Sequence, residues 1–366
     1  MITYHCPCCE KYWSYPIKQC IFCKGEIETV SESKYKVIGS TQVFVPSTSN
    51  EKVPYFVYLL EDRNGNRMTW KAFEAKEIGD MIDFTADRTD DNTVGVIGTG
   101  TLGLGIAEYL LRNHCAVVLK TRSEHSITKS KDKISKKLSK DHTTEDTEKL
   151  LKGLTITTEY RDLAGCELII EAVVEEIQTK KAVFKELSSV CSPETIFATN
   201  TSSLSIDAIA VTTDRPERFI GVHFFNPVSK MDLVEVIIGA STSEATKDRV
   251  IAFCQAINKK PISVSNAPGF IVNRLLLPQI NDAVRLYEAG VARKEDIDAA
   301  MKMGLNHPMG PFALADLIGI DICVMILLTL YSSLNEERFK PARTLMELYD
   351  SRKLGFKTGE GFYKYR

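Results

Sequence analysis

Thr93-Val-Gly-Val-Ile-Gly98-Thr-Gly100-Thr-Leu-Gly103 is the stretch that decides how most of this chain folds. Val94–Ile97 predicts a buried strand and Thr101–Arg112 predicts a helix, so Gly98 and Gly100 lie in the turn between them. Gly98 permits a tight turn, Gly100 lets the backbone approach a pyrophosphate, and Gly103 lets helix and strand pack closely. The helix N-terminus would offer free N–H groups to phosphates. The pattern indicates a dinucleotide-binding turn rather than a glycine-rich turn without a ligand.

Short apolar segments separated by helical patterns follow this turn. The expected strands are Ala116–Leu119, Leu168–Ala172, Ile196–Thr199, Phe219–His223 and Leu233–Ile237. Their alternation with helices predicts an α/β, doubly wound, mainly parallel sheet of the Rossmann type over residues 92–265. An all-α domain is expected over residues 266–366, with helices at Phe270–Ala289, Lys294–Met303, Pro311–Leu330 and Pro341–Lys353.

The end of the second expected strand bears on the choice of cofactor. Sites for NAD usually place Asp or Glu there to hold the adenine ribose hydroxyls. Here Thr121 occupies that position, flanked by Lys120, Arg122 and Ser123. A missing carboxylate removes the repulsion of a 2′-phosphate, and cationic donors can hold one, so the sequence favours NADP(H). The alternative is that Arg122 stacks on adenine while Glu124 serves the ribose, which would give NAD(H).

Two C-x2-C turns lie near the N-terminus, formed by Cys6 with Cys9 and by Cys20 with Cys23. Two such turns complete the four-thiolate site of structural zinc, and the metal would fold a segment too short for a core of its own. Iron in the same site is the alternative metal. Disulfides are disfavoured in a chain without an evident secretion signal. We expect a zinc ribbon over residues 1–30, with Cys8 as a spare thiol.

Residues 31–88 are rich in β-branched and aromatic residues and predict a small, OB-like β-barrel. The expected strands are Lys34–Val45, Val53–Leu60, Met68–Ala75 and Gly79–Phe84, with a hairpin turn at Asn64-Gly65. A polar, acidic linker is expected over residues 86–93. Binding of single-stranded nucleic acid would need a basic groove with stacking aromatics, whereas residues 40–90 are acidic on balance.

His223 and Glu235 form the candidate catalytic pair. His223 ends one apolar strand, and Glu235 lies inside another. A buried glutamate needs a partner, and the imidazole can supply it while the carboxylate fixes the ring and raises its basicity. Such a histidine can accept a proton as a hydride leaves the same alcohol carbon. Each residue alone could be structural, but beside a nucleotide site the pair favours a dehydrogenase.

Six further motifs support a family resemblance. They are Ile169-Ile-Glu-Ala-Val-Val-Glu, Thr199-Asn-Thr-Ser-Ser-Leu, His223-Phe-Phe-Asn-Pro, Pro268-Gly-Phe-Ile-Val-Asn-Arg, His307-Pro-Met-Gly-Pro and Lys357-Thr-Gly-Glu-Gly-Phe-Tyr. With the glycine-rich turn, they make the chain from about Thr93 onward resemble the (S)-3-hydroxyacyl-CoA dehydrogenases, particularly the bacterial 3-hydroxybutyryl-CoA type. The resemblance implies NAD(P)-dependent oxidation of a short-chain 3-hydroxyacyl-CoA in fatty-acid metabolism, or the reverse reduction.

The resemblance also implies roles for single residues. His223 would be the general base or acid, oriented by Glu235, with Ser202 and Asn273 beside the substrate oxygen. Glu175, Lys180 and Asn226 would line the nicotinamide side. The complete candidate set for the cofactor is Gly98, Gly100, Thr101, Leu102, Gly103, Thr121, Arg122, Ser123, Glu175, Lys180, Asn200 and Asn226. Thr121 replaces the Asp that is usual in the family, which leaves the choice between NAD and NADP open.

The resemblance further implies partners. In the family a helical excursion at the place of the Lys-rich helix Lys129–Lys140 faces CoA, although a solvated helix face is the usual role of any single lysine there. The α-domain would form a homodimer. The N-terminal segment resembles the rubredoxin-like zinc ribbon and OB-fold that accompany acyl-CoA enzymes, which implies docking of a thiolase or synthase. A dehydrogenase for a branched or aromatic 3-hydroxyacyl-CoA, or a subunit that channels substrate, is the alternative.

Composition excludes several other classes. The 366 residues carry 46 Lys and Arg against 48 Asp and Glu, a balance that disfavours a dedicated nucleic-acid binder. No apolar run reaches membrane-spanning length, and the N-terminus has no pattern of a signal peptide. We therefore expect a cytoplasmic protein that binds acyl-CoA and neither nucleic acid nor a membrane.

Overall fold

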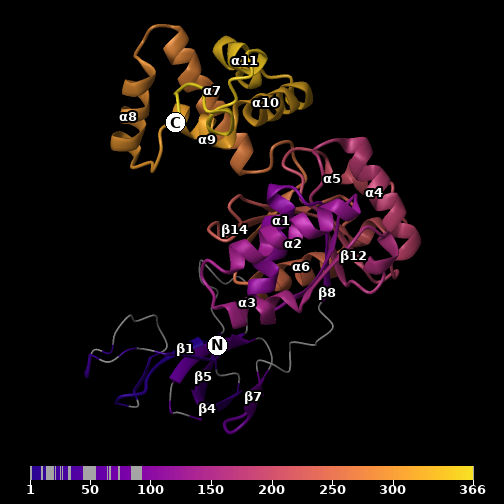
Figure 1. Cartoon of the computed structure of the whole chain (residues 1–366), viewed down its shortest axis with the longest axis vertical. Coiled ribbons are helices and arrows are strands. Elements are labelled where there is room, and N and C mark those ends of the chain that lie inside the picture. The colour runs from indigo at the N-terminus through magenta and orange to yellow at the C-terminus, as the bar shows by residue number, and fades with distance from the viewer. Residues whose placement is uncertain are drawn as a thin grey trace. The chain divides into compact units, whose positions relative to one another are not determined.

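The chain divides into two compact units, Met1–Asp91 and Asn92–Arg366, in a computed structural model. The structure describes residues 2–9, 11–13, 20, 22–24, 26, 28–31, 34–43, 55–63, 65, 67–72, 75–83 and 93–365. Figure 1 shows the small β-rich first unit and the larger second unit, in which a sheet is covered by helices. The expected linker, except Thr93, lies outside the described residues.

The first unit contains two small antiparallel sheets. One has the order β2-β1-β3 and is formed by β1 (Ile2–Cys6), β2 (Lys11–Trp13) and β3 (Glu28–Ser31). The other has the order β6-β5-β4-β7 and is formed by β4 (Lys34–Val43), β5 (Tyr55–Asp62), β6 (Arg67–Ala72) and β7 (Met81–Asp83). Tyr35, Val37, Tyr58 and Leu60 form its buried core. The described strands form an open four-stranded sheet, so closure into a barrel stays a prediction.

The second unit is built on an eight-stranded sheet with the order β10-β9-β8-β11-β12-β13-β14-β15. Its strands are β8 (Thr93–Ile97), β9 (Ala116–Lys120), β10 (Leu154–Thr157), β11 (Leu168–Glu171), β12 (Ile196–Thr199), β13 (Phe219–Phe224), β14 (Leu233–Ile238) and β15 (Lys260–Ser265). Neighbouring strands are parallel except β13 and β14, which are antiparallel. The predicted mainly parallel sheet is confirmed, and its order reverses between β8 and β11.

Helices cover both faces of this sheet (Figure 1). They are α1 (Thr101–Arg112), α2 (Glu124–Leu138), α3 (Thr144–Leu151), α4 (Ile177–Val190), α5 (Ile206–Ala210) and α6 (Glu244–Ala256). Central strands such as β11 and β13 are buried along their whole length, which explains why their sequences are apolar apart from Glu171 and His223. The two edge strands β10 and β15 were not predicted, because a half-exposed edge carries a weaker apolar pattern.

The C-terminal part of the second unit is helical. It contains α7 (Val272–Glu288), α8 (Lys294–Leu305), α9 (Pro311–Ile318), α10 (Ile320–Leu334) and α11 (Arg343–Asp350), packed around a core that includes Leu277, Phe312 and Leu327. The prediction of one helix over Pro311–Leu330 is wrong. The chain bends by 96° between α9 and α10, at Gly319, whose φ of +107° no ordinary helix residue adopts.

The bend also bears on membrane insertion. Among the described residues, no single helix has the length and apolar composition of a membrane span. The bent pair α9 and α10 passes the same test by length and composition alone. One face of each helix is buried in the helical core, with Phe312 and Leu327 fully enclosed.

Candidate active site

The glycine-rich turn between β8 and α1 has the geometry that a bound dinucleotide requires. Gly98 has a φ of +111°, and a Cβ there would lie 2.5 Å from the carbonyl oxygen of Ala172. A Cβ on Gly103 would lie 2.1 Å from the carbonyl oxygen of Gly98, so helix and turn pack as closely as the sequence predicts. A Cβ on Gly100 would meet no protein atom within 4 Å. The turn therefore keeps open room directly before the N-terminus of α1.

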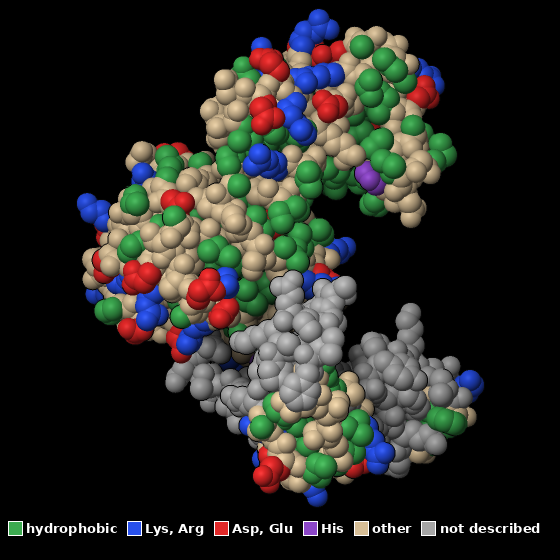
Figure 2. Space-filling view, turned by 180° about the vertical axis from the view of Figure 1, so that it is seen from behind, with side chains coloured by type: hydrophobic (Ala, Val, Ile, Leu, Met, Phe, Trp, Pro, Cys, Tyr) green, Lys and Arg blue, Asp and Glu red, His purple; other side chains and the backbone are tan. Residues whose placement is uncertain are grey.

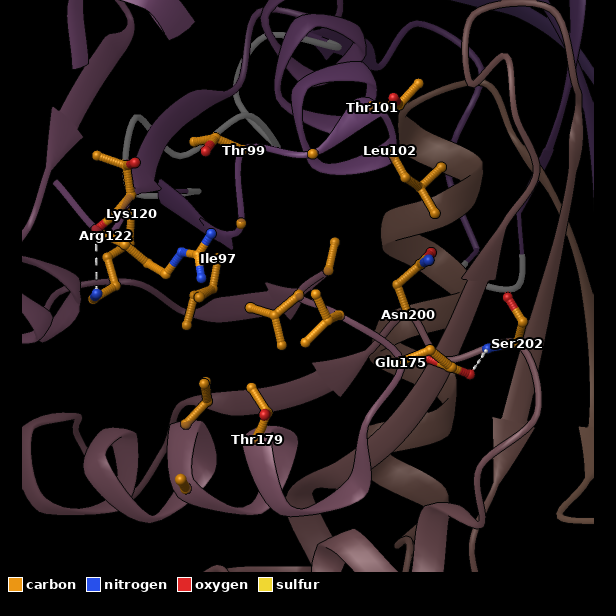
Figure 3. A pocket seen from close by; sticks show the side chains of 18 of the residues that line it. Ile97, Thr99, Thr101, Leu102, Lys120, Arg122, Glu175, Thr179, Asn200 and Ser202 are labelled. Carbon is orange, nitrogen blue, oxygen red and sulfur yellow. Dashed lines mark hydrogen bonds between the residues drawn. The ribbon is translucent and has the colours of Figure 1, made fainter. Parts of the chain in front are cut away.

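A cavity of about 850 Å³ lies along this turn and the carboxyl ends of the neighbouring strands (Figure 3). Nine of the residues predicted from the sequence line it: Gly98, Gly100, Thr101, Leu102, Thr121, Arg122, Glu175, Asn200 and Ser202. Seven of the predicted residues are not among its lining residues: Gly103, Ser123, Lys180, Asn226 and the catalytic candidates His223, Glu235 and Asn273. Tyr160, together with Ile322 and Met325 of α10, also lines the cavity, and no pattern in the sequence pointed to these residues.

Two buried polar atoms on this wall have no hydrogen-bond partner among the described residues. They are Thr121 Oγ1 and Asn200 Nδ2, on side chains 2% and 5% exposed. Desolvated donors of this kind are costly unless something binds them. Together with the open room at Gly100, they fit a polar ligand such as a dinucleotide. Figure 3 shows Asn200 far from Lys120 and Arg122, so the two ends of the cavity are chemically different.

Positive charge gathers at the end of the cavity near β9. The Lys120 Nζ atom donates to the Thr121 carbonyl at 3.3 Å and lies 4.1 Å from the centre of the Tyr160 ring. Burial lowers the pKa of Lys120, and Glu159 opposes part of that effect. Arg122 is exposed and lines the same end. Position 121, where NAD sites usually carry an Asp or Glu, is a threonine that lines the cavity. The carboxylate of Glu186 on α4 also lines the cavity.

His223 and Glu235 are brought together as the sequence predicts. They lie directly opposite each other on β13 and β14, and His223 Nδ1 is 2.7 Å from Glu235 Oε2. Both side chains are buried. Glu235 Oε1 accepts the backbone N–H groups of Ile271 and Val272, each at 3.0 Å. Burial raises the pKa of Glu235, but the bonds from His223, Val272 and Ile271 outweigh it and hold the pKa below its ordinary value.

Two hydrogen bonds connect this pair to the cavity. The N–H of Phe224, next to His223, donates to Asn200 Oδ1 at 2.8 Å. Asn273 lies one residue after Val272 and donates from Nδ2 to the Ser202 carbonyl at 3.1 Å. Because Asn200 and Ser202 line the cavity, these two bonds connect the segments that carry His223 and Glu235 to the end of the cavity that is remote from Arg122.

Glu175 and Lys180 are placed differently from each other. Glu175 lines the cavity, and its place on the nicotinamide side stays a prediction from the family resemblance. Lys180 is fully buried and cannot line it; its Nζ lies 2.8 Å from Glu171 Oε1 and 3.4 Å from Glu175 Oε2. Glu171 was missed as a site residue, although a carboxylate in the otherwise apolar strand β11 was a usable signal. Asn226 is exposed, and Ser123 bonds Ser126 at the start of α2.

A second hollow lies beside the start of α1. It measures about 280 Å³ and is lined by Thr101, Leu104, Lys133, Lys136, Lys137 and Lys140. The lysines belong to α2 and the turn that follows it, the Lys-rich segment singled out in the sequence. Several ammonium groups around one small hollow create a positive potential that attracts anions.

The predicted metal ligands of the first unit also lie together. The sulfur atoms of Cys6, Cys9, Cys20 and Cys23 are all within 4.8 Å of one another, and Cys8 is exposed. The backbone N–H groups of Phe22 and Cys23 each donate to Cys20 Sγ at 3.4 Å. Desolvation raises the pKa of Cys20, but these bonds outweigh it and leave the pKa at about 6. Thiolate character and convergence of this kind suit a divalent metal ion.

A Rossmann-type sheet, a cavity at its glycine-rich turn and a buried imidazole–carboxylate pair beside that cavity define a nicotinamide-dependent dehydrogenase. Comparison with known proteins agrees with this class. The NAD-binding domain of 3-hydroxyacyl-CoA dehydrogenase matches residues 93–267, and the C-terminal domain of the same family matches residues 269–365. The chain therefore belongs to the 3-hydroxyacyl-CoA dehydrogenase family.

Individual relatives cover the second unit almost completely. The 3-hydroxybutyryl-CoA dehydrogenase of Clostridioides difficile is 47% identical over 277 residues, which is 74% of this chain and 99% of the relative. The mitochondrial hydroxyacyl-coenzyme A dehydrogenase of Rattus norvegicus is 43% identical and covers 75% of this chain and 91% of its own. The crystal structure of (S)-3-hydroxybutyryl-CoA dehydrogenase from Ralstonia eutropha superimposes with a TM-score of 0.72 at 39% identity, over 75% of this chain and 99% of that chain.

Proposed function

We propose that this protein interconverts a short-chain (S)-3-hydroxyacyl-CoA and the corresponding 3-ketoacyl-CoA with a nicotinamide cofactor. The observation that carries the proposal is the 2.7 Å contact between His223 and Glu235 beside the dinucleotide cavity. The names of the relatives favour the 3-hydroxybutyryl thioester as the substrate.

The imidazole is oriented for proton transfer. Because Nδ1 faces Glu235, Nε2 is the nitrogen that exchanges a proton with the substrate oxygen on C3. In the oxidation Nε2 accepts the hydroxyl proton; in the reduction the imidazolium returns it. The Ser202 hydroxyl and the Asn273 amide act as hydrogen-bond donors to that oxygen, where charge changes most. The bound nicotinamide supplies or accepts the hydride, and the protein provides alignment and the proton path.

A rate measurement tests this function. Acetoacetyl-CoA and reduced cofactor, mixed with the full-length protein, should give cofactor oxidation, and (S)-3-hydroxybutyryl-CoA with oxidised cofactor should give the reverse. The (R)-thioester is the matched control and should not react. A protein that binds the cofactor and turns over neither direction would exclude the proposal.

The lysine-lined hollow supports the thioester part of the proposal. Lys133, Lys136, Lys137 and Lys140 surround it. CoA carries several phosphate charges, which ammonium groups bind as point charges. We assign this hollow to the CoA phosphates as a group, since each lysine alone is also an ordinary surface residue.

We propose that the cofactor of this protein is NADP(H). Thr121 leaves the strand end without the carboxylate that would repel a 2′-phosphate, and its buried Oγ1 atom offers a hydrogen bond. Arg122 and Lys120 add positive charge on the same wall. The family description names NAD, so the choice depends on this one end of the cavity.

A single added charge tests the choice of cofactor. We expect Thr121→Asp to lower kcat/KM for NADPH relative to NADH by roughly tenfold or more, because the new carboxylate lies where the 2′-phosphate would be repelled. Ser123→Asp adds the same charge at a residue that does not line the cavity and should change the ratio little. A wild-type preference for NADH, left unchanged by Thr121→Asp, would assign the cofactor as NAD(H).

We propose that Cys6, Cys9, Cys20 and Cys23 hold one structural zinc ion, with iron as the alternative metal. Elemental analysis of the full chain should give about one zinc per chain. Cys20→Ser should lose most of that metal, and Cys8→Ser, at an exposed cysteine outside the cluster, should keep it. A visible thiolate–iron absorption band instead would identify iron, and metal-free protein of unchanged stability would exclude a structural site.

The same proposal includes partners. Figure 2 shows hydrophobic side chains on the surface of the helical part of the chain. Among the described residues of this part, Leu275, Leu286, Val291, Met303 and Leu305 are 47–80% exposed. Exposed apolar side chains in this number support a homodimer formed through the α-domain. For the first unit we propose docking of a thiolase or synthase, which the acyl-CoA substrate makes chemically reasonable.

A further inference from the structure

The cavity has a nicotinamide end that can be assigned from the fold. In Rossmann-type sheets the pyrophosphate lies at the N-terminus of the first helix, and the adenosine lies over the end of the second strand. Here those places are α1 and the Lys120–Arg122 end of β9. The nicotinamide must therefore extend toward Glu175, Asn200 and Ser202, which Figure 3 shows on the opposite side of the cavity.

Three charged side chains lie together at that end. Lys180 Nζ is 2.8 Å from Glu171 Oε1 and 3.4 Å from Glu175 Oε2. The Glu171 and Lys180 side chains are 0% exposed, and the Glu175 side chain is 18% exposed. We call these residues the buried charge cluster. Only Glu175 touches the cavity, so the other two act on a ligand through it or through their electric field.

The surroundings of the cluster stabilise both carboxylates in the charged form. Glu171 accepts the Val173 N–H at 2.7 Å on Oε1 and the Thr199 hydroxyl at 2.7 Å on Oε2. Glu175 Oε1 accepts the backbone N–H groups of Ser202 at 2.8 Å and Ser203 at 3.1 Å. Every one of these neighbours is a donor, the arrangement that an ionised carboxylate requires.

The cluster therefore holds two negative charges and one positive charge, a net charge of −1 in a site from which solvent is largely excluded. A charge in such surroundings acts over several ångströms with little screening. The nicotinamide ring is the part of the cofactor that changes charge. It carries one positive charge when oxidised, and it becomes neutral when a hydride adds to it.

We propose that the net negative charge of the buried charge cluster makes the protein bind the oxidised cofactor more tightly, while it leaves binding of the reduced cofactor, whose ring is neutral, nearly unchanged. This inference rests on the proposed function, because it requires a nicotinamide at the Glu175 end. It has a consequence for direction. A site that stabilises the oxidised ring makes the bound reduced cofactor a stronger hydride donor, which favours reduction of the 3-keto group. The remaining charges on the wall, Lys120, Arg122 and Glu186, line the adenosine end, whose charge is the same in both states.

Binding constants test this directly. The dissociation constants of the oxidised and the reduced cofactor are measured by titration calorimetry with wild type and Glu175→Gln, each without substrate. Gln keeps an oxygen for the Ser202 and Ser203 N–H groups and removes the charge. We expect the ratio of affinities, oxidised over reduced, to fall on the order of tenfold. Glu186→Gln is the matched control, because it removes a carboxylate from the exposed adenosine end of the same cavity and should leave the ratio unchanged.

A second variant keeps the test decisive if Glu175→Gln does not fold. Glu171→Gln removes a charge from a residue that does not line the cavity, and it should move the ratio in the same direction by a smaller factor. An unchanged ratio in a folded variant, or an equal change in Glu186→Gln, would overturn the inference while leaving the dehydrogenase assignment intact. Wild-type protein that binds neither form of the cofactor would instead overturn the proposed function.

Discussion

His223→Gln should lower kcat for acetoacetyl-CoA reduction by about three orders of magnitude while cofactor binding stays near the wild-type value. General acid–base catalysis contributes about 10²–10⁴-fold, and the imidazole is the group that both accepts and returns the substrate proton. Glutamine has similar size and can bond Glu235, so the strand pair β13–β14 should be retained. The cofactor contacts assigned above do not include His223.

The measurement is a comparison of kcat with the cofactor dissociation constant. Single-turnover rates of cofactor oxidation at saturating acetoacetyl-CoA give the chemical step, and calorimetry gives the binding. A His223→Gln protein with near-normal kcat would remove His223 as the acid or base. Loss of cofactor binding together with turnover would show that the substitution had disturbed the fold instead.

Glu235→Gln should cost nearly as much, roughly 10²–10⁴-fold in kcat, for a different reason. The glutamine oxygen would stay with the N–H groups of Ile271 and Val272, so its NH₂ group would face His223 Nδ1. The imidazole would then carry its proton on Nε2. That tautomer cannot accept the substrate proton, and no negative charge remains to stabilise the imidazolium.

The dependence of the free energy of unfolding on pH gives a second test of the Glu235→Gln variant. The pKa of Glu235 is lower in the folded protein than in the unfolded chain, where 4.5 is the reference value. Its contribution to stability is therefore complete above that reference value and is lost as the pH falls through the lower, folded pKa. Between pH 5 and pH 3, wild type should lose more of its free energy of unfolding than Glu235→Gln does. Parallel losses in urea titrations would contradict the assigned bonds.

The strongest sequence signals came from residues whose chemistry conflicts with their surroundings. Glu235 is a carboxylate inside an apolar strand, and burial without a partner would be too costly, so a partner such as His223 could be inferred. The glycine turn was equally readable, because Gly98 and Gly103 leave no space for a side chain. These constraints are local, and a local pattern of residues is enough to express them.

Features that depend on tertiary packing were not predicted. The bend at Gly319 was missed because the apolar pattern of α9 continues into α10, and a single glycine does not disclose a positive φ. The family resemblance implied that Lys180 lines the nicotinamide side of the site, whereas the fold encloses this side chain between Glu171 and Glu175. Which residues of α10 meet the nucleotide cavity depends on how the helical part packs on the sheet.

The two oxygens of Glu235 belong to different parts of the second unit. Oε2 holds the imidazole on the sheet, and Oε1 holds the first turn of α7 in the helical part. If α7 moved away from the sheet, the Glu235 carboxylate would lose the N–H groups of Ile271 and Val272 as donors. The carboxylate would then be free to rotate, and it would hold the imidazole of His223 less firmly. Proton transfer by His223 therefore depends on contact between α7 and the sheet. When that contact is lost, the carboxylate no longer fixes the orientation of the imidazole.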